Sequence, residues 1–111
     1  MPNDPETRQG LNLEEVVKMI SDIDEIAVSD PLIHDLLISS DYKARFVGEY
    51  TELKIRYGIL HRMLVKHEAG TLEFEPTCDI SILEDQAYHM GNYLKTLEVR
   101  AEVEKIKLPR I

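Results

Sequence analysis

The sequence contains one cysteine and no tryptophan, and only 6% of its 111 residues are aromatic. A single cysteine, Cys78, cannot form a disulfide within the chain, which is typical of a protein in a reducing cytoplasm. With so few aromatic rings, we expect a core built mainly from aliphatic side chains. Glycine and proline number only five each, which favours helices over a turn-rich β fold.

Long apolar runs and an excess of positive charge are also missing. No stretch reaches the roughly 18 consecutive apolar residues that a membrane-spanning helix needs, and residues 1–10 lack the apolar segment of a signal peptide. The chain has 13 Lys and Arg against 21 Asp and Glu, a formal charge of −8. Because phosphate contacts need clustered cations, general nucleic-acid binding is disfavoured. We expect a cytoplasmic protein with a flexible tail over residues 1–10.

Apolar residues at helical spacing predict an all-α fold, with one helical domain over residues 11–111. Residues 11–40 are expected to form short acidic helices. The first follows the capping box Asn12-x-x-Glu15 and carries an apolar face from Leu13 to Ala27. The second runs over 32–38, after an aspartate and a proline that favour a helix start. The pattern leaves open whether the first helix packs on its own chain or on a neighbouring subunit.

Residues 41–108 are predicted to form a long antiparallel two-helix hairpin. The segments 41–68 and 81–108 each carry apolar residues at alternating intervals of four and three, the heptad pattern of a coiled-coil-like seam. Gly70 is expected to end the first helix, and Ser81-x-x-Glu84 to cap the second. A register with Leu53 opposite Leu94 brings large residues against small ones at both alanine positions of the seam. Since a thin hairpin leaves apolar faces uncovered, we expect a homo-oligomer.

One polar edge of the hairpin is the candidate ligand-binding surface. Gln86, Tyr93 and Arg100 recur every seven residues along the second helix, and Arg56 lies on the facing edge of the first. Arginine and tyrosine side by side can stack on a base and hold a phosphate. Arg45 belongs to the most basic stretch of the chain and joins this set. A solvated flank that only fixes the hairpin register is the alternative, and the sequence leaves it open. The candidate ligand-binding residues are Arg45, Arg56, Gln86, Tyr93 and Arg100.

No residue set in the sequence indicates catalysis, a cofactor or a metal. His67, Cys78 and Asp79 bracket the expected hairpin loop, but a zinc site there would need two further ligands at suitable spacing. The sequence has no glycine-rich phosphate loop, no serine nucleophile elbow and no His-Glu-x-x-His motif. We therefore expect a protein that is not an enzyme.

The two hairpin segments share a signature with a known family. Glu49-Tyr50-x-Glu52-Leu53-x-x-Arg56 is followed by Leu83-x-x-Gln86-x-x-x-Met90-x-x-Tyr93-x-x-x-Leu97-x-x-Arg100. Over residues 42–108 the chain resembles the crAss-phage-related small helical-hairpin proteins of tailed phages and prophages. The resemblance implies a phage or prophage origin, with the first forty residues as an addition. In organisation alone, the chain is also similar to phage proteins that sequester cyclic-nucleotide defence signals.

Two functional hypotheses follow from these features. In the first, a homo-oligomer holds a nucleotide-type immune signal in pockets between hairpins without cleaving it, for counter-defence or host takeover. In the second, an acidic face of the first helix, with Glu14, Asp22 and Glu25, binds a basic surface of a host protein as an inhibitor or scaffold. Neither hypothesis involves a membrane.

Overall fold

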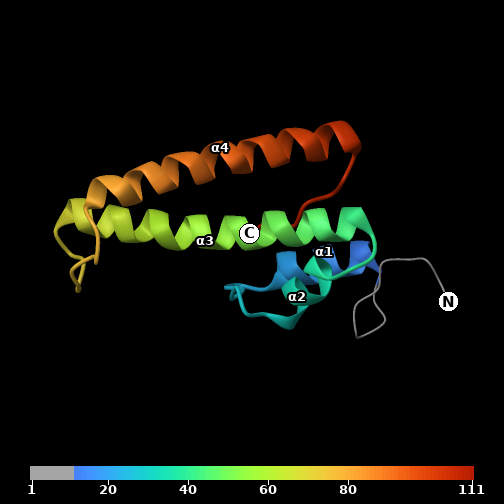
Figure 1. The fold of residues 1–111 in the computed structure, drawn as a ribbon. Coiled ribbons are helices and arrows are strands. Elements are labelled where there is room, and N and C mark those ends of the chain that lie inside the picture. Colours follow the sequence, from blue (N-terminus) through green and yellow to red (C-terminus); the bar gives the residue numbers. More distant parts are fainter. Residues whose placement is uncertain (1–11) are drawn as a thin grey trace.

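The computed structural model describes residues 12–111, so the tail expected over residues 1–10 lies outside the described part. The described part consists of four helices without strands: α1 (Leu13–Asp22), α2 (Pro31–Leu37), α3 (Tyr42–Ala69) and α4 (Ile80–Glu104). α3 and α4 form the hairpin, and α1 and α2 lie beside the end of α3 where it begins (Figure 1). The predicted all-α fold is confirmed.

Local capping chemistry sets most of the helix ends. Asn12 and Glu15 form the predicted capping box at the start of α1. The Asp41 carboxylate accepts a hydrogen bond from the Ala44 N–H at 3.0 Å and starts α3. Gly70 ends α3 with φ at 77°, a left-handed conformation that glycine adopts without a Cβ clash.

The start of α4 differs from the prediction. Asp79, and not Ser81, is its N-cap residue. The Asp79 carboxylate accepts hydrogen bonds from both the backbone N–H and the hydroxyl of Ser81, each at 2.9 Å. A carboxylate two residues earlier therefore takes the capping role, and the serine hydroxyl donates to it.

Contacts across the hairpin agree with the predicted register. The Tyr50 hydroxyl donates to Glu98 at 3.1 Å. At the end of the hairpin, the Arg100 guanidinium lies 4.6 Å from the centroid of the Phe46 ring. Both pairs lie within one position of the pairing that puts Leu53 opposite Leu94. The heptad pattern therefore predicted the alignment of the two helices correctly.

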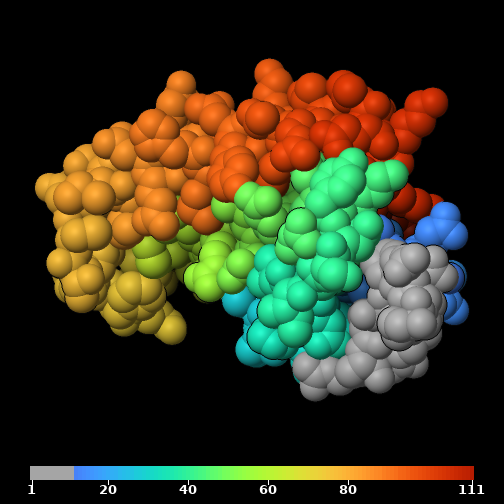
Figure 2. Space-filling view, turned by 45° about the vertical axis from the view of Figure 1, so that its right-hand side comes forward, coloured from blue at the N-terminus to red at the C-terminus, as the bar shows by residue number. Residues whose placement is uncertain are grey.

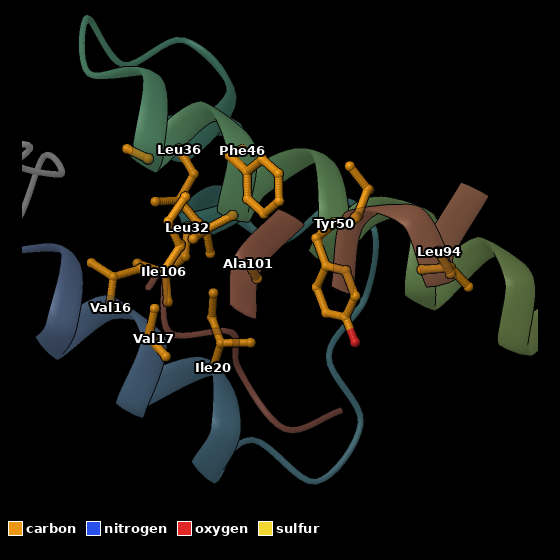
Figure 3. Packing of buried hydrophobic residues seen from close by; sticks show 13 residues of the cluster. Val16, Val17, Ile20, Leu32, Leu36, Phe46, Tyr50, Leu94, Ala101 and Ile106 are labelled. Atoms are coloured by element: carbon orange, nitrogen blue, oxygen red, sulfur yellow. The ribbon is translucent and has the colours of Figure 1, made fainter. Parts of the chain in front are cut away.

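The core lies at the end of the hairpin where α3 begins and α4 finishes. Figure 3 shows that α1, α2, both hairpin helices and the segment after α4 all contribute side chains to it. The apolar face of α1 is buried within its own chain, which answers the question that the sequence left open. The buried cluster consists of Val16, Val17, Ile20, Leu32, Leu36, Ala44, Phe46, Val47, Tyr50, Leu94, Leu97, Ala101 and Ile106.

Gly48 allows α2 to pack directly on α3. A Cβ atom at this position would lie 2.9 Å from the Leu36 Cβ atom and 3.1 Å from the Leu37 backbone nitrogen. Both distances are shorter than the separation at which such atoms attract. The missing side chain therefore sets how closely the two helices approach.

α1 is shorter than the sequence predicts. The apolar spacing predicts a helix that continues to Ala27, but α1 ends at Asp22 and Ile23 has extended backbone, with φ −82° and ψ 126°. Leaving the helix brings Ile23 and Ile26 beside Ile55 of α3 around a common cavity. Packing against α3 thus replaces the last predicted turn of the helix.

The chain also leaves α4 earlier than predicted, at Glu104 instead of Leu108. Lys105 takes the left-handed conformation with φ at 59°, and the Ile106 N–H donates to the Ala101 carbonyl at 2.9 Å. The segment then turns back toward α3, as Figure 1 shows at the red end of the chain. Ile106 is buried in the core and Leu108 packs against it, so these residues cover the core instead of extending the seam.

Candidate functional site

The five residues of the predicted ligand-binding set all lie exposed on the surface of the hairpin, and they are spread along it. Arg45 and Arg56 are eleven positions apart on α3, which corresponds to about 16 Å along the helix axis. Gln86, Tyr93 and Arg100 are spread over a similar length of α4. Within one chain, the five residues therefore form a row and not a pocket.

The arginines of this row already have partners in the chain. Arg45 Nη1 donates to the Ser39 carbonyl at 2.8 Å, and Arg56 pairs with Glu52 at 3.1 Å. Arg100 pairs with Glu104 at 3.0 Å. A ligand phosphate would have to share or displace these contacts.

The Arg100 contact also changes the chemistry of its carboxylate partner. The hydrogen bond from Arg100 lowers the pKa of Glu104, and a weaker hydrogen bond from the Tyr42 hydroxyl acts in the same direction. Glu104 therefore stays ionised at neutral pH and holds Arg100 over the Phe46 ring.

A cavity with three cationic side chains lies between α3, the segment after α1 and the segment after α4. Its volume is about 490 Å³, which is within the usual range for small-molecule sites. The cations are Lys54 and Arg62 from α3 and Arg110 from the segment after α4. The apolar wall consists of Ile23, Ile26, Ile55 and Ile111.

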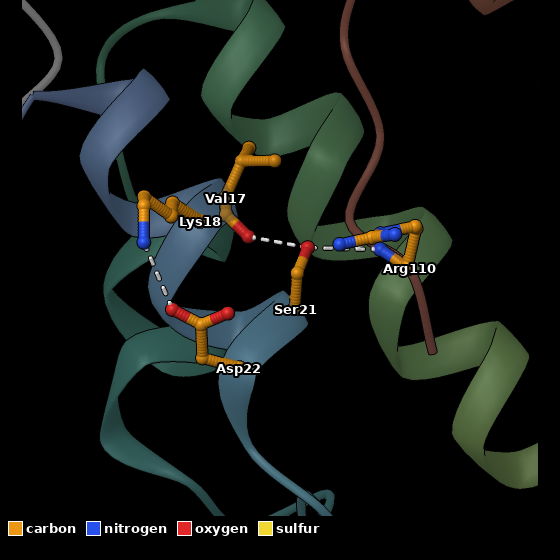
Figure 4. A network of polar contacts seen from close by, with 5 residues as sticks. All are labelled: Val17, Lys18, Ser21, Asp22 and Arg110. Carbon is orange, nitrogen blue, oxygen red and sulfur yellow. Dashed lines mark hydrogen bonds and ion pairs between the residues drawn. The ribbon is translucent and has the colours of Figure 1, made fainter.

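Helix geometry and one hydrogen bond place these cations around the same space. Lys54, Gly58 and Arg62 follow one another at intervals of four, so they share one face of α3. Gly58 lets the Arg62 guanidinium lie close to the helix backbone, since a Cβ atom there would come 3.4 Å from Arg62 Nη1. The backbone N–H of Arg110 donates to the Ser21 hydroxyl at 3.0 Å, and this hydrogen bond holds the last segment against α1 (Figure 4).

The three cations are available to an anion. The ion pairs between described residues do not include Lys54, Arg62 or Arg110. Two exposed acids, Asp24 and Glu25, also line the cavity and reduce its positive potential. The arrangement therefore suits a phosphate-bearing ligand with an apolar part, because arginine binds phosphate oxygens through two N–H groups at once.

A second cavity, of about 500 Å³, lies on the other side of the Ser21–Arg110 contact, between α1 and the last segment. Lys18 and Asp22 line it and pair with each other at 3.1 Å, as Figure 4 shows. Glu14 also lines this cavity. The acids proposed to bind a host protein are therefore exposed, and one of them, Asp22, is already paired with Lys18.

The described residues hold no group of three or more His, Cys, Asp or Glu side chains placed to bind a metal ion. Cys78 is exposed in the loop between α3 and α4. In the same part of the chain, no helix has both the length and the apolar character that a membrane crossing requires.

Sequence reasoning missed the cavity because its walls come from distant parts of the chain. Ser21 and Arg110 are separated by 89 positions, and no local pattern reports such a contact. One signal was present: the spacing of Lys54, Gly58 and Arg62 puts two cations and a glycine on one face of α3.

Comparison with known protein families matches residues 40–103 to the family described as Sequestin. No curated protein and no solved structure matches the chain. The matched range holds α3 and nearly all of α4, and it includes Lys54 and Arg62. Ser21 and Arg110 lie outside the matched range, so the remaining walls of the cavity come from the flanking segments.

Proposed function

Because this chain belongs to the Sequestin family, we propose that it is a non-catalytic binding protein that sequesters a nucleotide-type immune signal. A phage or prophage encodes it in this proposal, and it acts in the host cytoplasm by removing the signal without cleaving it. The family description supports sequestration. The phage resemblance of the hairpin supports a counter-defence context, and the cationic cavity supports an anionic ligand.

The observation that carries the proposal is the convergence of Lys54, Arg62 and Arg110 on one cavity with apolar walls. Phosphate oxygens of a nucleotide would accept hydrogen bonds from the arginines and face the lysine charge. The base would lie against the isoleucine side chains of the wall. No general base or nucleophile is required, since the proposed role ends with binding.

The polar edge, formed by Arg45, Arg56, Gln86, Tyr93 and Arg100, stays a second proposed contact set. Its residues are too widely spaced to surround one ligand within a single chain. They become neighbours of other binding groups only where the hairpins of a homo-oligomer meet. Tyr93, which is exposed, would then offer a ring for base stacking.

Calorimetry against a panel of cyclic oligonucleotides and ADP-ribose nucleotides tests this function. We expect heat from at least one compound, and chromatography should recover that compound unchanged. Arg62→Ala and Lys54→Ala should weaken its binding about 10-fold or more, the effect of losing one charge-assisted hydrogen bond. Lys95→Ala, an exposed lysine of α4 outside the cavity, is the matched control and should bind like the wild type.

Three outcomes would contradict parts of this proposal. No heat from any compound rejects nucleotide sequestration. Equal binding by Arg62→Ala, Lys54→Ala and the control rejects the cavity as the site. Cleavage of the bound compound rejects the non-catalytic role.

A host protein is the second candidate ligand, and the distribution of charge favours it. Residues 1–40 contain nine acids and two Lys or Arg, and Glu14 and Glu25 are exposed. An acidic surface of this kind binds basic surfaces and loses affinity as salt rises. Capture of a host protein that is salt-sensitive and lost in the Glu14→Lys, Glu25→Lys double variant would favour this function over nucleotide binding.

A further inference from the structure

Beyond the core, the segments after α1 and α4 reach α3 only as far as Arg62, and toward its tip the hairpin continues as two helices alone. From Lys54 in α3 to Tyr93 in α4, no described residue is buried. The seam residues Leu60, Leu64 and Leu83 are only partly covered in this region. Figure 2 shows the yellow tip of the hairpin standing clear of α1 and α2. We call residues 54–93 the distal hairpin.

One side of the distal hairpin has large apolar side chains that are exposed or half-buried. On α3, Ile59 and Met63 are four positions apart and share a face. On α4, Ile82 and Tyr93 share a face three turns apart. Ile59 is 53% exposed, Ile82 57% and Tyr93 44%. We call these four side chains the distal face.

Contacts at the other end of the hairpin indicate that both helices present this face on the same side. On α3, Met63 and Tyr42 lie in one row of residues that are spaced seven positions apart. On α4, Tyr93 and Arg100 are seven positions apart and lie in a second row. The rows meet there, because the Tyr42 hydroxyl donates to Glu104 and Arg100 pairs with the same carboxylate. Since the helices stay in heptad register, the rows remain side by side toward the tip.

The two helices of the distal hairpin carry opposite charges. Residues 54–69 contain four Lys and Arg and one acid, whereas residues 70–94 contain five acids and neither Lys nor Arg. A second copy is attracted when its acidic helix faces the basic helix of the first copy. It is repelled when helices of like charge face each other.

We propose that a second copy of this chain packs on the distal face, with α3 of each copy facing α4 of the other. This pairing requires a twofold axis along the hairpin, so both tips lie at the same end. The product is a four-helix bundle in which every neighbouring pair of helices is antiparallel. It covers Ile59 and Ile82 of both copies and satisfies the charge pattern at the same time.

The pairing also completes the polar edge. Arg56 of one copy comes to nearly the same level as the partner copy's Tyr93, because facing helices repeat the register of the hairpin. A guanidinium and a phenol ring from different copies then flank a shared site. This last step rests on the proposed function, whereas the pairing itself rests only on apolar surface and charge.

Solution mass tests the pairing. We expect the wild type to have twice the 12.8 kDa mass of one chain. Ile59→Asp and Ile82→Asp should each shift it to the single-chain mass, since a carboxylate would be buried in the interface without a partner. Val65→Asp is the control: Val65 is 52% exposed and lies two positions from Met63, on the opposite side of α3, so the double mass should persist. A single-chain mass for the wild type, or double mass in both Asp variants, overturns the proposal.

Cys78 tests the direction of the pairing, because it is the one cysteine and is exposed in the tip loop. With both tips at one end, the loops lie about one helix diameter apart, roughly 10 Å, and a short bis-maleimide joins the chains. If the two hairpins instead run in opposite directions and overlap over 16 residues of each helix, their tips lie about 24 Å apart. A dimer that does not crosslink overturns the proposed twofold axis. Cys78→Ser and Ile59→Asp should both abolish the product.

Calorimetry with Ile82→Asp, a variant on α4 outside the cavity, separates this inference from the function. A single-chain variant that binds a nucleotide as tightly as the wild type contradicts the shared site at the interface, whatever the pairing. A dimeric wild type that binds no nucleotide contradicts the proposed function and leaves the pairing intact. Weaker binding by the single-chain variant supports both.

Discussion

Near its start, α3 packs against α2 and α4 and shares a core with α1 and the last segment, whereas near the tip it has only α4 beside it. The helix pattern continues unchanged between these two ends. Six residues of α3 between Ala44 and Thr51 are buried. They include Phe46 and Gly48, which lie on opposite sides of the helix. After Lys54 no residue of α3 is buried, and many positions outside the seam are charged, although Ile59 and Val65 are apolar and exposed. Heptad spacing therefore specifies the hairpin, while the residues between the heptad positions decide where other segments cover it.

The cationic cavity lies at the boundary between the covered and the uncovered part of α3. Thr51 is fully buried, its hydroxyl donating to the Val47 carbonyl at 2.7 Å. One turn farther, Lys54 and Ile55 already line the cavity. The place where α3 loses its cover is thus also the place where the chain offers space and positive charge.

The largest expected effect comes from shortening an apolar side chain at each end. Ile20→Ala, at a side chain that is fully buried, should lower the free energy of unfolding by about 3 kcal/mol. Leu64→Ala, in the partly covered seam, should lower it by about 1 kcal/mol. Urea denaturation of both variants at low protein concentration measures the difference. Equal losses would mean that the two ends are equally packed.

Glycine replacements test the packing of the two ends of the hairpin separately. Gly48→Ala should destabilise the protein by about 1–3 kcal/mol, since the new methyl group would press on Leu36 and Leu37. Gly91→Ala meets only the Tyr57 ring, at 3.6 Å, and should stabilise α4 by up to about 1 kcal/mol. Thermal unfolding should therefore shift in opposite directions. A loss of stability in Gly91→Ala would show that the distal hairpin is tighter than its exposure indicates.

The smallest expected effect concerns Tyr50, where the covered region ends. Burial raises the pKa of Tyr50 to about 12, and the hydrogen bond to Glu98 acts in the same direction. Because the pKa is higher in the folded chain than in the unfolded one, this group's contribution to stability is full below about pH 10 and is lost as the pH rises toward 12. An absorbance titration of the phenolates should lack its most alkaline step in Tyr50→Phe. An unchanged titration curve would contradict the burial of this hydroxyl.

Features that depend on neighbouring residues could be predicted from the sequence. The caps at Asn12 and Gly70 are local hydrogen-bond or φ preferences, and the hairpin register follows from repeated leucines. Asp79 was missed because a capping-box pattern two residues later competed with it. The interpretation of the polar edge as a ligand site stays a prediction.

Features that depend on the whole chain could not be predicted in this way. The ends of α1 and α4 follow from Ile23, Ile106 and Leu108 turning back to pack elsewhere, although Ile23 and Leu108 fit the helical spacing. The cavity requires Arg110 beside Ser21, and periodicity carries no information about contacts between segments so far apart.

The contact between Arg110 and Ser21 also makes one wall of the cavity separable from the hairpin. It closes almost the whole described chain into one loop, since its two members are separated by 89 positions. Ordering so long a loop costs more chain entropy than closing the short connection between α3 and α4. Local opening of the last segment therefore removes one of the three cations from the cavity while the hairpin stays intact.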